Sequence, residues 1–322
     1  MDGPSGFSVC VVAPCYNEAS VIERFLAALR ASLDRISGAR CRIVIVDDGS
    51  TDGTLRILNE LAAEDPRLEV YALSRNFGHQ IALSAGIDVA QGDAVLLMDS
   101  DLQHPPDVAR EMVALWRSSG VDVISAVRRT TSDASLFKRW SGRVFYSLIN
   151  RMSETPITPG AAEFCLLSAR AHRALRAMPE RHRFLRGMIS WIGFERAVVE
   201  YDAPPRPGGE SKYTFLKMVA LAMDAIVSFS ATPMKMATRA GALAAVAGGG
   251  YLLFALARYL LVGDLERGWG SLISAVLILG GFQLLFLGLM GEYLVRLFDE
   301  AKRRPLYLFK QTPDTKPGDV PR

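Results

Sequence analysis

Residues 94–103 read AVLLMDSDLQ, an apolar run of strand length that ends in two aspartates and a glutamine. Side chains two apart in an extended chain point to the same side, so we expect Asp99 and Asp101 together at the end of a strand, with Gln103 just beyond. Two nearby carboxylates repel each other unless a cation lies between them, and oxygen ligands suit Mg²⁺ or Mn²⁺. The stretch therefore predicts a divalent-cation site, and the simpler alternative is a pair of solvated aspartates in a turn.

Similar apolar runs alternate with amphipathic segments up to residue 130. We expect strands at residues 7–14, 42–46, 68–73, 93–98 and 121–127, with helices between them. Such alternation with short links predicts an α/β domain with a mostly parallel sheet, covered by helices on both faces. Ligands of these sheets bind beyond the carboxyl ends of the strands, where polar clusters follow at residues 14–18, 47–50 and 99–103.

Some nucleotide-binding patterns are missing from the sequence. No Gly-x-Gly-x-x-Gly follows the first expected strand, and no Gly-Lys-Ser or Gly-Lys-Thr loop occurs. The first pattern binds the pyrophosphate of dinucleotides and the second binds nucleotide phosphates. A dinucleotide-dependent oxidoreductase is therefore disfavoured, and a nucleotide would have to be held another way. The net charge is only +3, and no basic run contains interleaved aromatic residues, which argues against a nucleic-acid partner.

The hydrophobic content of the chain is concentrated in two long runs. Hydrophobic residues make up 50 % of the 322 residues, and the mean hydropathy is +0.17. Residues 240–263 are apolar except for Arg258, and residues 269–291 carry no charge. Because about 20 apolar residues in a helix span a bilayer, and only a polar turn at 264–268 separates the runs, we expect a transmembrane hairpin. A pair of buried core helices is the alternative.

Basic residues flank the outer ends of this hairpin more than its turn, at Lys235, Arg239, Arg296, Lys302, Arg303 and Arg304. Lys and Arg concentrate on the cytoplasmic side of membrane helices, so we expect both termini and the α/β domain in the cytoplasm. No signal peptide is expected, because the first residues lack a basic start and an apolar core.

Six stretches of the sequence together resemble one enzyme family. They are APCYNE at 13–18, IVIVDDGSTDGT at 43–54, SRNFGHQIALSAG at 74–86, LLMDSDLQHPP at 96–106, PERHRFLRGMISWIGF at 179–194 and GGESKYTFLKM at 208–218. In this order and spacing, the chain resembles inverting family-2 glycosyltransferases of the GT-A fold. The similarity is greatest to the polyprenyl-phosphate branch, which contains dolichol-phosphate mannose synthases and bactoprenol glucosyltransferases.

The resemblance covers about residues 8–300 and implies an order of domains. A cytoplasmic GT-A domain, Rossmann-like with a mostly parallel sheet, is expected at 1–205. A juxtamembrane amphipathic segment follows at 206–235. Two transmembrane helices, at about 240–263 and 269–291, lie within 236–298, and 299–322 forms a cytoplasmic tail. The location implied is the inner membrane of a bacterium.

The resemblance also assigns roles to residues of the polar clusters. It implies nucleotide binding by Pro14, Tyr16, Glu18, Val46, Asp48, Asp99 and Ser100. The cation, Mg²⁺ or Mn²⁺, would be held by Asp99, Asp101 and Gln103. A carboxylate at a strand end can also accept from a base N–H or a ribose hydroxyl, which suits Asp48, although a cap near a helix is its simpler interpretation.

Cationic residues are expected to hold the acceptor phosphate. Arg128 lies where the family has an arginine near the phosphates, and further candidates are Lys138, Arg139, Arg183, Arg186 and Lys212. Each alone could be a solvated charge, whereas together, beside a membrane-lying helix, they suit an anionic lipid phosphate. The predicted catalytic residues are Asp101, Arg128 and Glu163.

One departure from the family pattern concerns Glu163. Many bacterial relatives have Gly-Asp-Phe-Arg where this chain has Ala-Glu-Phe-Cys at 162–165. The family aspartate is a candidate general base or acceptor-positioning group, and Glu163 keeps its carboxylate while Cys165 loses a guanidinium. A phosphate monoester is already largely ionised near pH 7, so Glu163 is expected to orient more than to abstract a proton.

The resemblance implies transfer of one sugar from a nucleotide-sugar, with UDP-glucose favoured, to undecaprenyl or another polyprenyl phosphate with inversion. A GDP-mannose-dependent enzyme similar to dolichol-phosphate mannose synthase is the alternative. A processive polysaccharide synthase is disfavoured, because no Gln-x-x-Arg-Trp motif occurs. A lipid flippase or non-catalytic membrane partner has little support from two spans without an intramembrane charge pair. A homo-oligomer is compatible with all of these functions.

Overall fold

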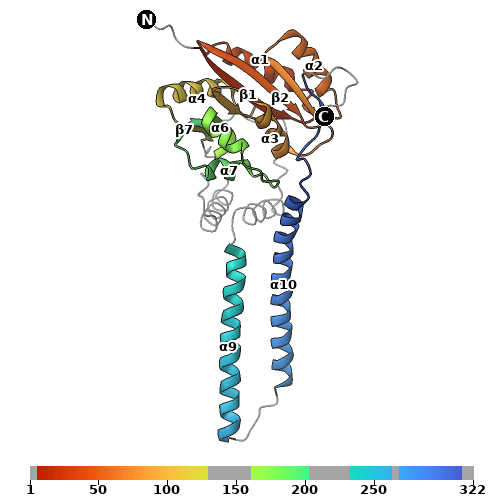
Figure 1. The fold of residues 1–322 in the computed structure, drawn as a ribbon, viewed down its shortest axis with the longest axis vertical. Coiled ribbons are helices and arrows are strands. Elements are labelled where there is room, and N and C mark those ends of the chain that lie inside the picture. The colour runs from red at the N-terminus through yellow and green to blue at the C-terminus, as the bar shows by residue number, and fades with distance from the viewer. Residues whose placement is uncertain (1–5, 130–160, 203–231, 263–267, 314–322) are drawn as a thin grey trace. The chain divides into compact units, whose positions relative to one another are not determined.

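The computed structural model describes residues 6–129, 161–202, 232–262 and 268–313, which form two units (Figure 1). One unit is an α/β domain that includes the segment after residue 303, and the other contains two long helices. The expected juxtamembrane segment falls largely on residues 203–231, outside the described part.

The α/β unit is built on an eight-stranded sheet with the order β7-β5-β6-β4-β1-β2-β3-β8. Parallel pairs join β1 to β2 and β4, β2 to β3, and β5 to β7. Strand β6 runs antiparallel between β4 and β5, and β8 pairs antiparallel with β3. The strands are β1 (Phe7–Cys15), β2 (Ala39–Asp47), β3 (Leu68–Leu73), β4 (Ala94–Leu97), β5 (Val123–Arg128), β6 (Ala161–Ser168), β7 (Arg196–Tyr201) and β8 (Phe309–Gln311).

The mostly parallel α/β sheet predicted from the sequence is therefore confirmed, while the antiparallel strands β6 and β8 were not foreseen. Helices connect the strands and supply the core: α1 (Ile22–Leu33), α2 (Thr54–Glu64), α3 (His79–Val89), α4 (Pro106–Ser119), α6 (Ala169–Arg176) and α7 (Leu185–Trp191). Because strand side chains alternate in direction, Val9 and Val11 of β1 join the core cluster with α1 and α4, whereas Val12 faces Gly86 of α3. Helices thus cover both faces of the central strands. This explains why these strands are continuous apolar runs in the sequence.

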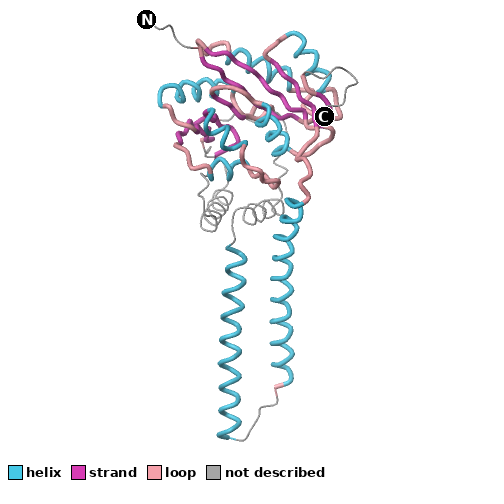
Figure 2. The backbone as a smooth tube through the Cα atoms, viewed as in Figure 1, coloured by secondary structure: helices cyan, strands magenta, loops and turns pink. Residues whose placement is uncertain are grey.

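The second unit contains α9 (Thr232–Val262) and α10 (Trp269–Ala301), drawn as the two long helices in Figure 2. Within the described residues, one stretch, Ile278–Ala301, is long and apolar enough to cross a membrane. The sequence predicted two such spans, and the structure provides one candidate together with a second long helix.

The chain returns to the α/β unit after α10. The backbone N–H of Ser74 donates to the carbonyl of Leu308 at 2.8 Å, and the rings of Tyr71 and Phe309 lie 5.3 Å apart. The hydroxyl of Tyr307 donates to a carboxylate oxygen of Asp88 at 2.9 Å. Part of the expected C-terminal tail therefore forms the edge of the sheet.

Candidate active site

Three parallel strands, β1, β2 and β4, end at the same edge of the sheet, and the polar clusters that follow them meet there. Cys15 at the end of β1 is in register with Asp47 at the end of β2. The hydroxyl of Ser100, two residues beyond Met98, donates to the carbonyl of Pro14 at 2.8 Å. The direction of the parallel strands predicted that these clusters share one edge of the sheet. In the structure they lie together at that edge.

The loops after β1 and β2 are interlocked by hydrogen bonds. The N–H of Asn17 donates to the hydroxyl of Ser50 at 2.9 Å, and the amide oxygen of Asn17 accepts from the N–H of Thr51 at 2.8 Å. Asn17 has a φ of 55°, which asparagine tolerates better than most side chains. This arrangement fixes Tyr16 and Glu18 on either side of Asn17, and Tyr16 is 43 % exposed.

Asp48, predicted to contact the nucleoside, is held by the main chain of the loop before α3. It is 2 % exposed, and its two oxygens accept from the N–H groups of Phe77 and Gly78 at 2.7 and 2.9 Å. Burial raises the pKa of Asp48 despite these hydrogen bonds. Gly49, with a φ of 69°, packs so closely on the Arg75 backbone that a Cβ atom would collide with it. Asp48 therefore anchors the loop that leads into α3.

Pro14 and Val46, which were also predicted to bind the nucleotide, are buried at the ends of β1 and β2.

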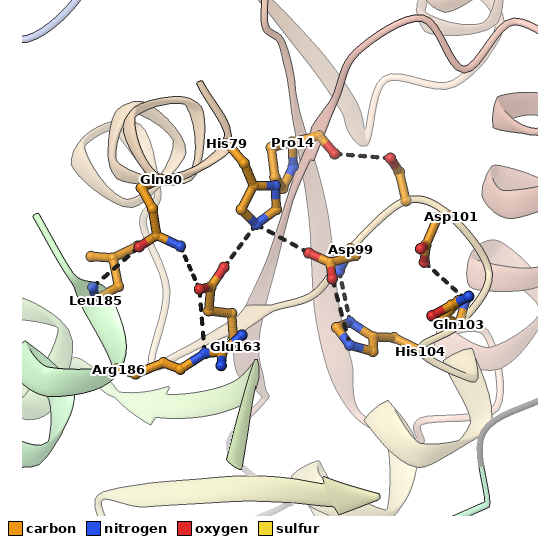
Figure 3. A network of polar contacts seen from close by, with 11 residues as sticks. Pro14, His79, Gln80, Asp99, Asp101, Gln103, His104, Glu163, Leu185 and Arg186 are labelled. Atoms are coloured by element: carbon orange, nitrogen blue, oxygen red, sulfur yellow. Dashed lines mark hydrogen bonds and ion pairs between the residues drawn. The ribbon is translucent and has the colours of Figure 1, made fainter. Parts of the chain in front are cut away.

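The Asp-x-Asp loop folds back on itself after β4 (Figure 3). A carboxylate oxygen of Asp101 accepts from the N–H of Gln103 at 2.9 Å. The N–H of Asp99 donates to Nδ1 of His104 at 2.9 Å, and Leu102 between them has a φ of 62°. The tight turn keeps Asp99, Asp101 and Gln103 in one short loop at the edge of the sheet.

Asp99 belongs to a cluster that the sequence did not predict. Nε2 of His79 lies 3.3 Å from Oδ1 of Asp99 and 2.7 Å from Oε2 of Glu163. The other oxygen of Glu163 accepts a short hydrogen bond from Gln80, and Nε of Arg186 lies 3.4 Å from it. These residues come from the start of α3, the loop after β4, the first half of β6 and the start of α7 (Figure 3).

Neighbouring charges shift the pKa values within this cluster. Burial raises the pKa of Asp99, and the nearby carboxylates of Glu163 and Asp101 add to the rise. Burial alone would also raise the pKa of Glu163, but the hydrogen bond from His79 and the charge of Arg186 outweigh it and lower the pKa. Burial opposes protonation of His79, yet the two carboxylates raise its pKa.

A divalent cation fits this edge of the α/β unit. Oδ1 of Asp99 is buried and has no hydrogen-bond partner among the described residues. The charge of Asp101 also contributes to the raised pKa of Glu18, after burial, so several carboxylates lie near one another. Ligand atoms of His79, Asp99 and Glu163 all lie within 4.8 Å of one another. The carboxylates of Asp99 and Asp101 repel each other, and such hard oxygen ligands are the kind that a Mg²⁺ or Mn²⁺ ion stabilises.

Residues 10–176 match the family described as Glycosyl transferase family 2. The chain belongs to this family. An uncharacterized glycosyltransferase of Bacillus subtilis, YkcC, is 38 % identical over 94 % of this chain and 93 % of its own length. The bactoprenol glucosyl transferase of Shigella phage SfII is 36 % identical, over 94 % of this chain and 98 % of its own.

An Escherichia coli protein described as a prophage bactoprenol glucosyl transferase homolog is 34 % identical, with the same coverage. Among solved structures, mannosyl-3-phosphoglycerate synthase from Rubrobacter xylanophilus is similar with a TM-score of 0.50 and 19 % identity. That similarity covers 69 % of this chain and 74 % of the other, and it supports the GT-A fold of the α/β unit.

The remaining predicted residues of this glycosyltransferase differ in their placement. Arg128 is exposed at the end of β5. Arg183 donates to the carbonyls of Glu180 and Met178 at 3.2 and 3.1 Å and so stabilises the turn before α7. Lys138, Arg139 and Lys212 lie outside the described residues.

Cys165 is buried in β6, with a pKa raised by burial to about 12. It is therefore a core residue of the sheet.

His79, Gln80 and His104 are the residues that sequence reasoning missed. All three lie within stretches that resemble the family, at 74–86 and 96–106, but no pattern in the sequence indicated their partners. Their contacts reach residues on other elements, so only the folded chain assigns them to the site.

Proposed function

We propose that this family 2 glycosyltransferase transfers a single sugar from a nucleotide-sugar to a polyprenyl phosphate, with UDP-glucose and undecaprenyl phosphate as its substrates. The observation that carries the proposal is the cluster of Asp99, His79 and Glu163 at the carboxyl edge of the sheet. Similarity to bactoprenol glucosyl transferases over 94 % of the chain supports the choice of substrates.

The donor is proposed to bind at the edge formed by the interlocked loops. Tyr16 is exposed there and offers an aromatic face and a hydroxyl, while Glu18 offers a carboxylate. Asp48 contributes indirectly, because it holds the loop at 75–78 in place. Asp99, Asp101 and Gln103 would hold Mg²⁺ or Mn²⁺, which when bound neutralises charge on the departing diphosphate.

In the proposed reaction, a phosphate oxygen of the lipid attacks the anomeric carbon of the donor sugar. The new carbon–oxygen bond forms as the bond to the nucleoside diphosphate breaks, and the electron pair leaves with the diphosphate. A single displacement inverts the anomeric centre. Because the attacking oxygen is already ionised near pH 7, the reaction needs orientation of the acceptor more than removal of a proton.

Glu163 suits an orienting role. It is 6 % exposed, and donors from His79 and Gln80 occupy its oxygens, with Arg186 beside them. The carboxylate thereby fixes two groups, an imidazole and a guanidinium, that can face a substrate phosphate. Arg128 is proposed to contribute a further positive charge to acceptor binding, as are Lys138, Arg139, Arg183 and Lys212.

The enzyme is proposed to be anchored in a bacterial inner membrane by a hairpin of α9 and α10, with the α/β domain and both termini in the cytoplasm. Support comes from the apolar stretch Ile278–Ala301 and from the uncharged or nearly uncharged runs in both helices. Reporter fusions after residue 322 and within the turn at 264–268 are expected to lie on opposite sides of the membrane. Reporters on the same side would contradict the hairpin.

Product analysis tests the proposed reaction. Purified full-length protein in detergent is supplied with undecaprenyl phosphate, Mn²⁺ and one donor at a time from a panel of UDP- and GDP-sugars. We expect release of UDP from UDP-glucose, dependent on both lipid and metal, and a lipid product heavier by one hexose. Turnover with GDP-mannose alone would identify GDP-mannose as the donor in place of UDP-glucose. The absence of turnover with every donor would contradict the proposed function.

A further inference from the structure

His104 lies in the loop between β4 and α4 and is 5 % exposed. Its Nδ1 is 2.9 Å from the backbone nitrogen of Asp99. A backbone N–H can only donate, so Nδ1 must accept, and the proton of a neutral imidazole must then be on Nε2. Nε2 lies 3.6 Å from Oδ2 of the same aspartate (Figure 3). One ring therefore faces both the main chain and the side chain of Asp99.

Aromatic packing holds the imidazole in this orientation. The ring stacks on Phe164 with centroids 4.7 Å apart and an interplanar angle of 16°. The ring of Tyr201 meets it edge-on at 6.3 Å and 88°. Phe164 itself is fully buried in β6, next to Glu163. Because neighbouring strand residues point to opposite faces, β6 supports His104 with one residue and contacts His79 with the other.

The two oxygens of Asp99 consequently have different surroundings. Oδ2 faces Nε2 of His104, while Oδ1 faces His79 and has no hydrogen-bond partner among the described residues. Because Nδ1 accepts from the backbone N–H of Asp99, the ring accepts at this nitrogen and donates from Nε2 at once. A protonated ring would lose the acceptor that the Asp99 backbone needs.

We propose that His104 is a positioning residue for Asp99: it fixes the rotamer of the carboxylate from the side of Oδ2, so that Oδ1 is left to bind the divalent cation. The inference rests on the metal assignment in the proposed function. An asparagine or glutamine at position 104 would also offer an acceptor and a donor, but it would lack the rigid ring that stacks on Phe164. Outer partners of metal ligands typically change metal affinity by about 10- to 100-fold when they are replaced.

The decisive variant is His104→Phe, which keeps an aromatic ring against Phe164 and removes both nitrogens. Binding of Mn²⁺ to the full-length protein, with and without UDP, is measured by electron paramagnetic resonance of the free ion, so no turnover is needed. We expect the Mn²⁺ dissociation constant to rise about 10- to 100-fold. His104→Gln, which restores an acceptor and a donor, is expected to fall between this variant and the wild type.

His172→Phe is the matched control. His172 is also buried, at 4 % exposure, and its ring hydrogen-bonds a backbone carbonyl, that of Ile87, at 2.7 Å, but it lies in α6. We expect wild-type Mn²⁺ affinity in this variant, with a loss of thermal stability similar to that of His104→Phe. Comparing His104→Phe with His172→Phe separates an effect on Mn²⁺ affinity from a general effect on folding.

Coupling to Asp99 provides the final test. If His104 acts through this carboxylate, His104→Phe should weaken Mn²⁺ binding little further in a protein that already carries Asp99→Asn. Additive losses, or wild-type affinity in His104→Phe and His104→Gln, would overturn the inference and leave the proposed function intact. A wild-type protein that transfers sugar without binding Mn²⁺ or Mg²⁺ would instead overturn the metal assignment and the inference together.

Discussion

Nε2 of His79 lies 2.7 Å from Oε2 of Glu163, although the two residues are 84 positions apart. His79 is the first residue of α3, and Glu163 lies on β6, which pairs with β4 just before the Asp-x-Asp loop. The contact therefore joins the helix that follows β3 to the strand inserted beside β4. It also fixes what the carboxylate can do, because its oxygens are already occupied by donors of the chain.

Glu163→Gln should lower turnover by roughly 100-fold while changing nucleoside-diphosphate affinity little, because a misoriented acceptor slows the chemical step. Gln keeps the shape of the side chain but loses the charge that holds His79 and Arg186. Single-turnover rates and UDP affinity measure the two effects separately. Glu180→Gln, an exposed glutamate in the turn before α7, is the control and should behave as wild type. Equal rates in Glu163→Gln and wild type would remove Glu163 from the site.

The pH dependence distinguishes orientation from proton abstraction. The pKa of Glu163 lies below its ordinary value of 4.5, so the carboxylate stays ionised throughout the pH range in which the enzyme can be assayed. A general base works best with a pKa near the working pH. We therefore expect Glu163 itself to add no acidic limb to the wild-type rate profile between about pH 5 and 9. An acidic limb present in wild type and lost in the variant would instead identify Glu163 as the base.

Asp101→Ala should abolish metal-dependent transfer without unfolding the α/β unit. Loss of a ligand from a metal that stabilises a leaving group raises the barrier by several kcal/mol, so turnover should fall at least about 100-fold. Asp107→Ala is a matched control, since Asp107 is exposed in the first turn of α4 and pairs only loosely with Arg35 at 3.5 Å. Full activity of Asp101→Ala, or of wild type in excess chelator, would disprove the metal role.

Asp122 should contribute stability that disappears in acid. Its carboxylate accepts from the hydroxyl of Ser168 at 2.7 Å and from Nε of Arg170 at 3.2 Å, and the Arg170 hydrogen bonds lower its pKa most. A lowered pKa in the folded state means that the stabilisation is complete above the ordinary pKa of 3.8 and is lost as the pH falls through the folded value.

Asp122→Asn should therefore be less stable than wild type at pH 7, by about 1 kcal/mol, and the difference should shrink toward pH 3. Thermal unfolding of both proteins across this range measures it. A difference that is independent of pH would show that the charge of Asp122 does not contribute.

Tyr307→Phe should loosen the edge strand β8 and leave the rest of the sheet intact. The variant loses the hydrogen bond from the Tyr307 hydroxyl to Asp88, and a hydrogen bond of this kind contributes about 1 kcal/mol. The N–H of Ser74, which donates to Leu308, should then exchange with solvent roughly fivefold faster. Hydrogen exchange followed by mass spectrometry measures this, and unchanged protection at Ser74 in the variant would contradict the anchoring role.

The sequence by itself determined the parallel half of the fold and the place of the site. The expected strand at 68–73 has the bounds of β3, and the strand expected at 7–14 ends one residue short of β1. Strand and helix periods are local properties, and the direction of parallel strands places their carboxyl ends at one edge. The polar clusters around Tyr16, Asp48 and Asp99 could be located for this reason alone.

Only the tertiary structure decided which side chains meet there. Strand β6 runs antiparallel between β4 and β5, and this insertion brings Glu163 to His79 and Phe164 to His104. Strand β8 pairs with β3 from more than 200 positions further along the chain. Pairing over such distances depends on packing of the whole sheet and leaves no periodic signal in either partner, so these contacts could not be predicted from the sequence. The same holds for the hydrogen bonds by which Asp48 anchors the loop before α3.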